Sequence, residues 1–304
     1  MSEKIKTIAL FPGQGSQKVG MGKALFEECP LAKGVLEAAD VALGFKISEI
    51  LLNGPETELT RTEIAQPAIL TVSVACFESA KANLHESYQI VAAAGHSLGE
   101  YSALVAAGAI DFSDAVRLVH KRGQYMQSAV PLGQGKMVAV IGKELAEIEA
   151  ALTKATGVAE VANINAPGQV VVAGDVSGVT SFVAALGKAR VIELQVSAPF
   201  HCSLMKPAQD QLWEDLKTIK ISPPRFPVYS NFLAEPASDP EGIRQSLRQQ
   251  VCGRVRWAES VQNMVSQHHP TSAHEFGHGE VLTNMLKRIA PQLKTVGHPT
   301  MSKS

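Results

Sequence analysis

The chain has 304 residues, of which 45% are hydrophobic, 5% aromatic and 19% charged, and its formal net charge is -1. This length predicts about two domains or subdomains, and the near-neutral charge argues against a dedicated nucleic-acid binder, which needs a large positive field. The longest nearly apolar stretch, residues 103–110, is much shorter than the roughly 18 residues that a membrane span needs.

The four cysteines lie far apart and form no Cys-x-x-Cys pair: Cys29, Cys76, Cys202 and Cys252. This usage predicts neither a disulfide framework nor a cysteine zinc site, and it fits a reducing compartment. The apolar run after the charged N-terminus, residues 8–11, is far shorter than the apolar core of a signal peptide. We therefore expect a cytoplasmic protein.

The first part of the chain alternates short apolar runs with helical patterns. A run that ends at Pro12-Gly13 and another that ends at Gly95 are each typical of a buried strand. The strands are expected at residues 5–11 and 89–94, and helices at 21–28, 68–84, 100–107 and 113–128, the last capped by Asp111 or Ser113.

The pattern then changes to strand–helix–strand–strand–helix–strand, which is the ferredoxin-like order. Its strands are expected at 136–141, 159–164, 170–173 and 191–196, and its helices at 144–155 and 177–186. We place an inserted subdomain at residues 130–198, which splits the main domain into 1–129 and 199–304. In the second segment, helices are expected at 204–218, 246–251, 257–267 and 281–289, and strands at 227–230 and 272–276. The fold class is therefore α/β.

Residues 95–99 read Gly-His-Ser-Leu-Gly, a match to G-x-S-x-G. An apolar strand precedes the motif and a helix follows it, which is the setting of a nucleophile elbow. The flanking glycines permit a sharp turn that exposes Ser97 at the helix N-terminus, where the Leu98 amide and the helix dipole can stabilise an oxyanion. The alternative is a plain glycine-rich turn.

A second glycine turn, Pro-Gly-Gln-Gly-Ser-Gln at residues 12–17, follows the first strand. It lacks the third glycine of a dinucleotide-binding fingerprint, and the chain has no P-loop motif. At the carboxyl end of a strand in an open sheet, its amides, including that of Gln14, can complete an oxyanion hole with Leu98. A turn without function is the alternative.

Arg122 falls on the apolar stripe of the helix expected at 113–128, between Val119 and Met126. A charge on a core-facing stripe is tolerated when it is paired. Two interpretations stay open: a structural arginine that is paired internally or extends its stem along apolar surface, or a guanidinium fork that awaits a substrate carboxylate.

His201 follows an expected strand and precedes an expected helix, and its ordinary pKa suits a general base. A structural histidine is the alternative, and His96 is the competing base.

Residues 274–278, His-Glu-Phe-Gly-His, match the H-E-x-x-H zinc pattern. Because glycines interrupt the helix that this pattern requires, we expect a strand end and a turn there, and no zinc.

Several motifs occur in order along nearly the whole chain, at residues 11–17, 95–100, 122–127 and 200–205, with 165–169 and 255–257 in addition. In this combination the chain resembles malonyl-CoA:acyl-carrier-protein transacylases, including the acyltransferase domains of polyketide synthases. The resemblance implies an α/β-hydrolase-like core with an inserted ferredoxin-like subdomain. It also implies ping-pong transfer of a malonyl group from malonyl-CoA to the thiol of an acyl carrier protein, without a metal or organic cofactor.

The same resemblance assigns Ser97 as the nucleophile and His201 as the base, with the amides of Gln14 and Leu98 as the oxyanion hole. Arg122 matches the arginine that holds the malonyl carboxylate, and Gln250 matches a glutamine whose backbone orients the histidine. Gln250, His96 and Phe200 are expected beside the substrate, with Phe200 as the malonyl-selecting variant. The chain departs from the family at residues 277–280, Gly-His-Gly-Glu, where Gly-Pro-Gly-Lys is expected.

Two other functions compete with the transferase. A serine hydrolase would use the same elbow, with Asp111, Asp114 or Asp175 before His201, or Asp239 before His278, as acid and base. That function leaves a buried arginine without a role. A carrier-binding protein without activity would need neither Ser97 nor His201.

For the carrier we expect a docking face around Arg244, Arg248, Arg254 and Arg256, with Lys206, Lys287 and Arg288 as alternatives. We expect a monomer.

Overall fold

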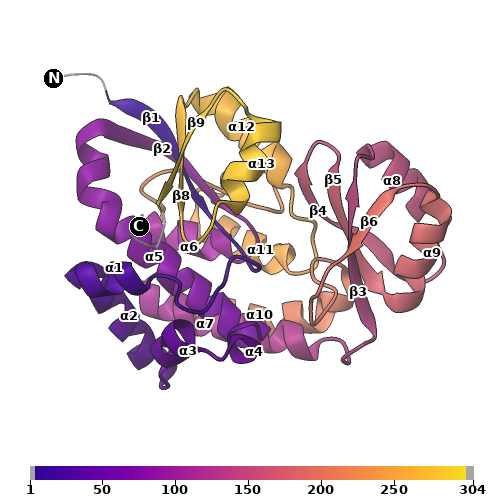
Figure 1. Cartoon of the computed structure of the whole chain (residues 1–304), viewed down its shortest axis with the longest axis horizontal. Helices are drawn as coiled ribbons and strands as arrows, with labels where there is room; N and C mark the ends of the chain where they lie inside the picture. The colour runs from indigo at the N-terminus through magenta and orange to yellow at the C-terminus, as the bar shows by residue number, and fades with distance from the viewer. Residues whose placement is uncertain (1–3, 299–304) are drawn as a thin grey trace.

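The computed structural model describes residues 4–298, apart from the side chains of residues 82, 83 and 85. Two sheets divide these residues into a larger and a smaller part, which lie side by side (Figure 1). The larger sheet is parallel, in the order β7-β2-β1-β8-β9. Its strands are β1 (Ile5–Phe11), β2 (Tyr88–Gly95), β7 (Val228–Tyr229), β8 (Ser272–Phe276) and β9 (Lys294–His298).

The central strand β1 is buried on both faces because helices cover both sides of the parallel sheet. Alternate side chains of β1 enter different cores: Ala9 and Phe11 enter the large one, and Ile8 and Leu10 the other. The large core is closed chiefly by α1 (Lys23–Glu28), α2 (Pro30–Leu43), α3 (Ile47–Asn53), α4 (Glu56–Leu59), α5 (Thr62–Ser87), α6 (Gly99–Ala106), α7 (Phe112–Ser128) and α10 (Lys206–Leu216). The other is closed by α12 (Trp257–His268) and α13 (Val281–Ile289).

The smaller sheet is antiparallel, in the order β4-β5-β3-β6. Its elements are β3 (Gly135–Ile141), α8 (Leu145–Leu152), β4 (Ala159–Ala166), β5 (Gln169–Asp175), α9 (Val176–Leu186) and β6 (Arg190–Glu193). Val138 and Val140 of β3 pack with the helices, whereas Met137 and Ala139 face the large core. This period of two gives the small sheet one face for its own helices and one face toward the main domain.

The structure confirms the predicted alternation of elements and differs from it at several points. Helices α2, α3 and α4 and strand β9 were not predicted. Helix α11 (Pro240–Gln250) begins before residue 246 because the Asp239 side chain caps it and Pro240 occupies its first turn. Strand β6 ends at Glu193, where its pairing with β3 ends. None of the helices in the described residues is long and apolar enough to cross a bilayer.

Candidate active site

The turn that carries Ser97 joins the carboxyl end of β2 to α6, and Ser97 itself has φ +51°. A Cβ on Gly95 would lie 1.8 Å from the carbonyl carbon of Gly99, and a Cβ on Gly99 would lie 2.1 Å from the Phe11 carbonyl oxygen. Both positions therefore require glycine, which explains the motif sterically. The predicted strand–turn–helix setting of Ser97 is present.

Asn231, just after β7, binds this turn through two hydrogen bonds. Its Oδ1 accepts the Ser97 amide hydrogen at 2.6 Å, and its Nδ2 donates to the Gly95 carbonyl at 2.7 Å. The residue is fully buried. Asn231 was not among the predicted site residues, although its position directly after a short expected strand was a usable signal.

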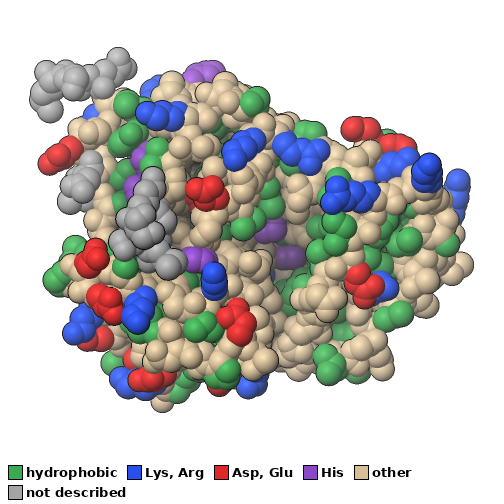
Figure 2. All heavy atoms as spheres, viewed as in Figure 1, with side chains coloured by type: hydrophobic (Ala, Val, Ile, Leu, Met, Phe, Trp, Pro, Cys, Tyr) green, Lys and Arg blue, Asp and Glu red, His purple; other side chains and the backbone are tan. Residues whose placement is uncertain are grey.

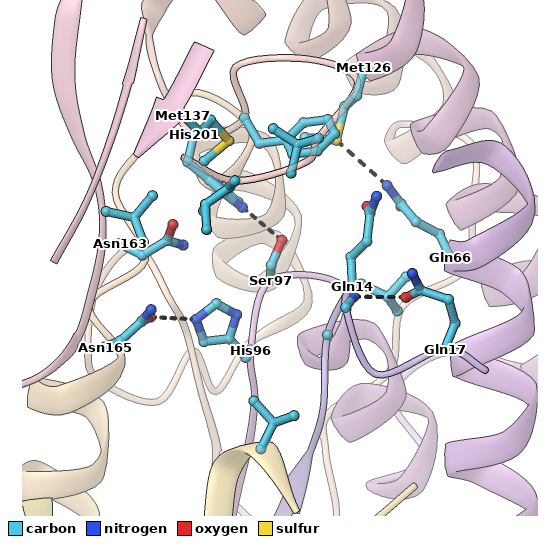
Figure 3. A pocket seen from close by; sticks show the side chains of 18 of the residues that line it. Gln14, Gln17, Gln66, His96, Ser97, Met126, Met137, Asn163, Asn165 and His201 are labelled. Carbon is cyan, nitrogen blue, oxygen red and sulfur yellow. Dashed lines mark hydrogen bonds between the residues drawn. The ribbon is translucent and has the colours of Figure 1, made fainter. Parts of the chain in front are cut away.

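His201 lies beside Ser97, with Nε2 at 2.7 Å from Ser97 Oγ (Figure 3). Its Nδ1 lies 2.9 Å from the Gln250 carbonyl oxygen. Because a carbonyl only accepts, the proton belongs on Nδ1, and Nε2 is left as the acceptor that faces the serine. Burial, with the nearby charge of Arg122, lowers the pKa of His201 to about 3. The imidazole is thus a neutral acceptor at physiological pH.

The other candidates for the base and acid lie elsewhere. His96 turns its Nε2 to Asn165 Oδ1 at 2.8 Å (Figure 3), and burial lowers its pKa. The four aspartates considered for a hydrolase are engaged locally: Asp111, Asp175 and Asp239 cap helices, and Asp114 pairs with Arg117. The structure therefore contradicts the Ser–Asp–His alternative, because a backbone carbonyl stands where its carboxylate would be.

Arg122 lies on the buried stripe of α7, as predicted, and is 1% exposed. Its side chain projects toward Ser97. Its Nη1 donates to Gln66 Oε1 at 2.8 Å, and its Nη2 lies 3.2 Å from Ser97 Oγ and 3.1 Å from Gln250 Oε1. The guanidinium also lies over the Tyr101 ring, 5.5 Å from its centroid. No carboxylate of the described residues forms an ion pair with it.

These side chains surround a cavity of about 390 Å³ between the two parts of the molecule. Figure 2 shows histidine side chains on the floor of this hollow. Seven of the eight predicted site residues line it: Gln14, His96, Ser97, Leu98, Arg122, Phe200 and His201. Gln250 does not line the cavity as expected, because it is fully buried behind Arg122. Its backbone carbonyl does contact His201 Nδ1, as the resemblance implied.

The two glycine turns lie against each other at the carboxyl ends of β1 and β2. The His96 amide donates to the Phe11 carbonyl at 3.0 Å, and a Cβ on Gly13 would lie 2.3 Å from the His96 carbonyl oxygen. Gln14 and Leu98, one from each turn, both line the cavity. The side chain of Gln14 is held separately, by a 3.3 Å hydrogen bond from its Nε2 to Thr62 Oγ1.

The H-E-x-x-H match has a structural explanation. Its first three residues lie in strand β8, as predicted, and not in a helix. Glu275 is buried, and its two carboxylate oxygens accept the backbone amides of Leu282 and Thr283 at 3.0 and 2.8 Å. The carboxylate thereby caps α13, which supplies part of the cavity wall.

The arginine run expected to bind a carrier is only partly free. Arg244, Arg254 and Arg256 each pair with a glutamate, and Arg244 also donates to three backbone carbonyls. Arg248 stacks on Trp213 at 4.7 Å. The run contains no acidic residue in sequence, but folding brings acidic partners to it from neighbouring segments. Figure 2 shows Lys and Arg side chains along the upper rim of the cleft.

Comparison with known protein families matches residues 9–286 to the acyl transferase domain. The chain is 41% identical over 298 residues to the malonyl CoA-acyl carrier protein transacylase of Bacillus subtilis, covering 96% of this chain and 92% of that protein. It is 42% identical over 289 residues to the protein of the same name from Escherichia coli K12, covering 93% of each.

Solved structures show the same likeness. An acyl carrier protein S-malonyltransferase from Vibrio cholerae superposes with a TM-score of 0.92 at 40% identity, covering 96% of each chain. A malonyl-transacylase in complex with a type II PKS acyl-carrier protein superposes with a TM-score of 0.92 at 38% identity, covering 96% of this chain and 95% of that one.

Proposed function

The chain belongs to the acyl transferase family, among the malonyl CoA-acyl carrier protein transacylases, and we propose that Ser97 carries the malonyl group through this reaction. The enzyme is an acyltransferase that moves malonyl from malonyl-CoA to acyl carrier protein. The observation that supports our assignment is the 2.7 Å contact between Ser97 Oγ and a neutral, buried His201 Nε2.

In the first half-reaction His201 Nε2 takes the proton of Ser97 while Oγ attacks the thioester carbonyl. The tetrahedral intermediate collapses with cleavage of the carbon–sulfur bond, and the imidazolium returns the proton to the departing CoA thiolate. The Gln250 carbonyl, which accepts from Nδ1, holds the ring for both transfers and stabilises the imidazolium without a carboxylate. The product is a malonyl ester of Ser97.

In the second half-reaction the carrier's phosphopantetheine thiol takes the place of CoA. His201 removes the thiol proton, sulfur attacks the ester carbonyl, and Ser97 leaves with the proton. Every bond and proton is accounted for by these two side chains and the two thiols, so the mechanism needs neither a metal nor an organic cofactor. Water must be kept from the ester between the two half-reactions.

The oxyanion of each intermediate is assigned to the backbone amides of Gln14 and Leu98. Leu98 is the residue before the first turn of α6, so its amide points from a helix N-terminus. Gln14 belongs to the glycine turn that packs on the nucleophile turn. Removing one such donor commonly costs about 10²–10³ in rate.

Arg122 is assigned to the free carboxylate of the malonyl group. That carboxylate is two bonds from the carbon that Ser97 attacks, and Arg122 Nη2 is 3.2 Å from Ser97 Oγ, so the guanidinium is within reach. The fork is fixed in advance by Gln66 and Gln250, which reduces the conformational entropy lost on binding. Phe200 and His96 are placed on the cavity wall beside the acyl group.

The proposal extends to organisation and location. The order β4-β5-β3-β6 of the small sheet supports a ferredoxin-like subdomain at residues 130–198, inserted into an α/β-hydrolase-like core at 1–129 and 199–304. The four free cysteines favour the reducing cytoplasm. We retain a monomer and the absence of nucleic-acid partners as expectations, and we place the reaction in fatty-acid or polyketide biosynthesis.

The test uses intact mass. Incubation with malonyl-CoA should add one malonyl group to the wild-type protein, and the Ser97→Ala variant should gain none. The His201→Ala variant should acylate about 10²–10⁴ more slowly. Addition of acyl carrier protein should then move the label to the carrier. An adduct on another residue would overturn the assignment of Ser97, and discharge of the ester to water in preference to the carrier would favour the hydrolase.

A further inference from the structure

The structure buries one more charged group next to the site, the carboxylate of Glu100 at the start of α6. The residue is 3% exposed. Its Oε2 accepts the backbone amide of Asn231 at 2.9 Å and Gln250 Nε2 at 2.7 Å. The mechanism above assigns no step to Glu100. Since a buried carboxylate is costly unless something compensates its charge, its position requires an explanation.

The compensating charge is Arg122, and the side-chain amide of Gln250 joins the two. Gln250 Oε1 accepts from Arg122 Nη2 at 3.1 Å, while Gln250 Nε2 donates to Glu100. A guanidinium only donates and a carboxylate only accepts, so this orientation of the amide is the one that satisfies both. The amide dipole therefore points its oxygen at the cation and its hydrogens at the anion. All three side chains are buried.

We propose that Glu100 is the counter-charge of Arg122 and sets how strongly the guanidinium binds the donor's carboxylate. The inference rests on the proposed function of Arg122. In the free enzyme the pair Arg122–Glu100 is neutral through Gln250, so the site does not hold stray anions tightly. When a malonyl group enters, its carboxylate shares Arg122 with Glu100. Glu100 is thus a specificity-determining residue that never touches the substrate.

The surroundings leave Glu100 as the group that titrates near neutrality. Burial raises the pKa of Glu100 to about 7, against the opposing effects of its hydrogen bonds and of Arg122. The other titratable groups near it are held away from that range. Burial lowers the pKa values of His96 and His201 and raises that of Tyr101 to about 12, while Arg122 stays cationic. The counter-charge therefore develops as the pH rises through 7.

The decisive variant is Glu100→Gln. Its amide oxygen can accept both hydrogen bonds that Glu100 Oε2 accepts, so the geometry is kept and the charge is lost. At pH 8 we expect the half-saturating concentration of malonyl-CoA in single-turnover self-malonylation to be about tenfold lower in the variant than in the wild type. This is the effect expected when the repulsion of one charge is removed at an effective dielectric constant near 20. The limiting rate should change less. Half-saturation by acetyl-CoA, which carries no carboxylate, should be unchanged.

The pH dependence gives a readout that a structural role would not produce. The measured quantity is the half-saturating concentration of malonyl-CoA divided by that of acetyl-CoA. In the wild type this ratio should rise about tenfold from pH 6 to pH 8. In Glu100→Gln it should not change over that range. The CoA phosphates titrate equally with both donors and cancel in this ratio. Asp40→Asn is the matched control: it removes a buried carboxylate of α2 that bonds to Ser48, and it should leave both half-saturation values unchanged.

The outcomes separate this inference from the proposed function. If wild-type protein is not malonylated, the function and the inference fall together. If the wild type is malonylated but folded Glu100→Gln shows wild-type half-saturation at pH 8, or shifts both donors equally, the inference alone is wrong. If Glu100→Gln does not fold, the wild-type ratio of the two donors decides: a ratio that is level from pH 6 to pH 8 overturns the inference.

Discussion

The preference for malonyl over acetyl groups should reside in Arg122, and its truncation tests this most directly. The guanidinium is 1% exposed and lies 3.2 Å from Ser97 Oγ, so a malonyl carboxylate that enters the site is removed from water and depends on this partner. Removing one partner of a buried pair costs about 3–5 kcal/mol. Arg122→Ala should therefore lower kcat/KM for malonyl-CoA by about 10²–10³ or more.

Acetyl-CoA provides the internal comparison, because its acyl group makes no demand on the guanidinium. Arg122→Ala should lose much less activity with acetyl-CoA, because the acetyl group carries no carboxylate that depends on the guanidinium. Arg122→Lys should recover part of the malonyl activity, because a point charge cannot reproduce contacts made by two separate nitrogens, one to Gln66 and one to Ser97 and Gln250.

The assay is the ratio of kcat/KM for the two donors in the wild type and both variants, with thermal unfolding as a check on the fold. Truncation also leaves the acceptor oxygens of Gln66 and Gln250 without their donor. We therefore expect a lower unfolding temperature, and the loss of folded enzyme should affect both donors equally. Equal losses for the two donors would refute the reasoning. Arg122 would then be a structural partner of Gln66 and Gln250, and the carboxylate would be bound elsewhere.

Other predictions concern the turn, the base and the carrier. Asn231→Ala, which removes the acceptor of the Ser97 amide, should slow self-malonylation about tenfold or more at an unchanged half-saturation by malonyl-CoA; a normal rate would show that the glycines suffice. Because the pKa of His201 is lowered to about 3 by burial and by the Arg122 charge, the imidazole stays neutral on acidification, so the rate at saturating malonyl-CoA should be level from pH 8 to pH 5; a decline centred near pH 6.5 would contradict this. Charge reversal of Arg248 and Arg254 should weaken transfer to the carrier and leave self-malonylation intact; a carrier rate that does not change would place the docking face elsewhere.

Much of the fold was readable from local patterns. Strand β1 and helix α13 were predicted with the bounds that the structure has, because a short apolar run closed by Pro-Gly and an amphipathic stretch after a glycine turn are local signals. Helices α2 to α4 and strand β9 were missed. Strand β9 is only half-buried, contains polar residues and carries no strong local signal, and it becomes a strand by pairing with β8.

The amino-acid sequence by itself determined the parts of the site that depend on short-range geometry. Gly95 and Gly99 are needed because neighbouring backbone leaves no room for a Cβ, and the helical period places Arg122 on the buried face of α7. Only the tertiary structure decided what surrounds them. Asn231 and Gln250 reach the Ser97 turn across 134 and 153 positions of the chain, and no local pattern encodes a contact at that distance. It is the packing of the sheet that brings these residues together, where burial then gives His201 and Glu100 their altered pKa values.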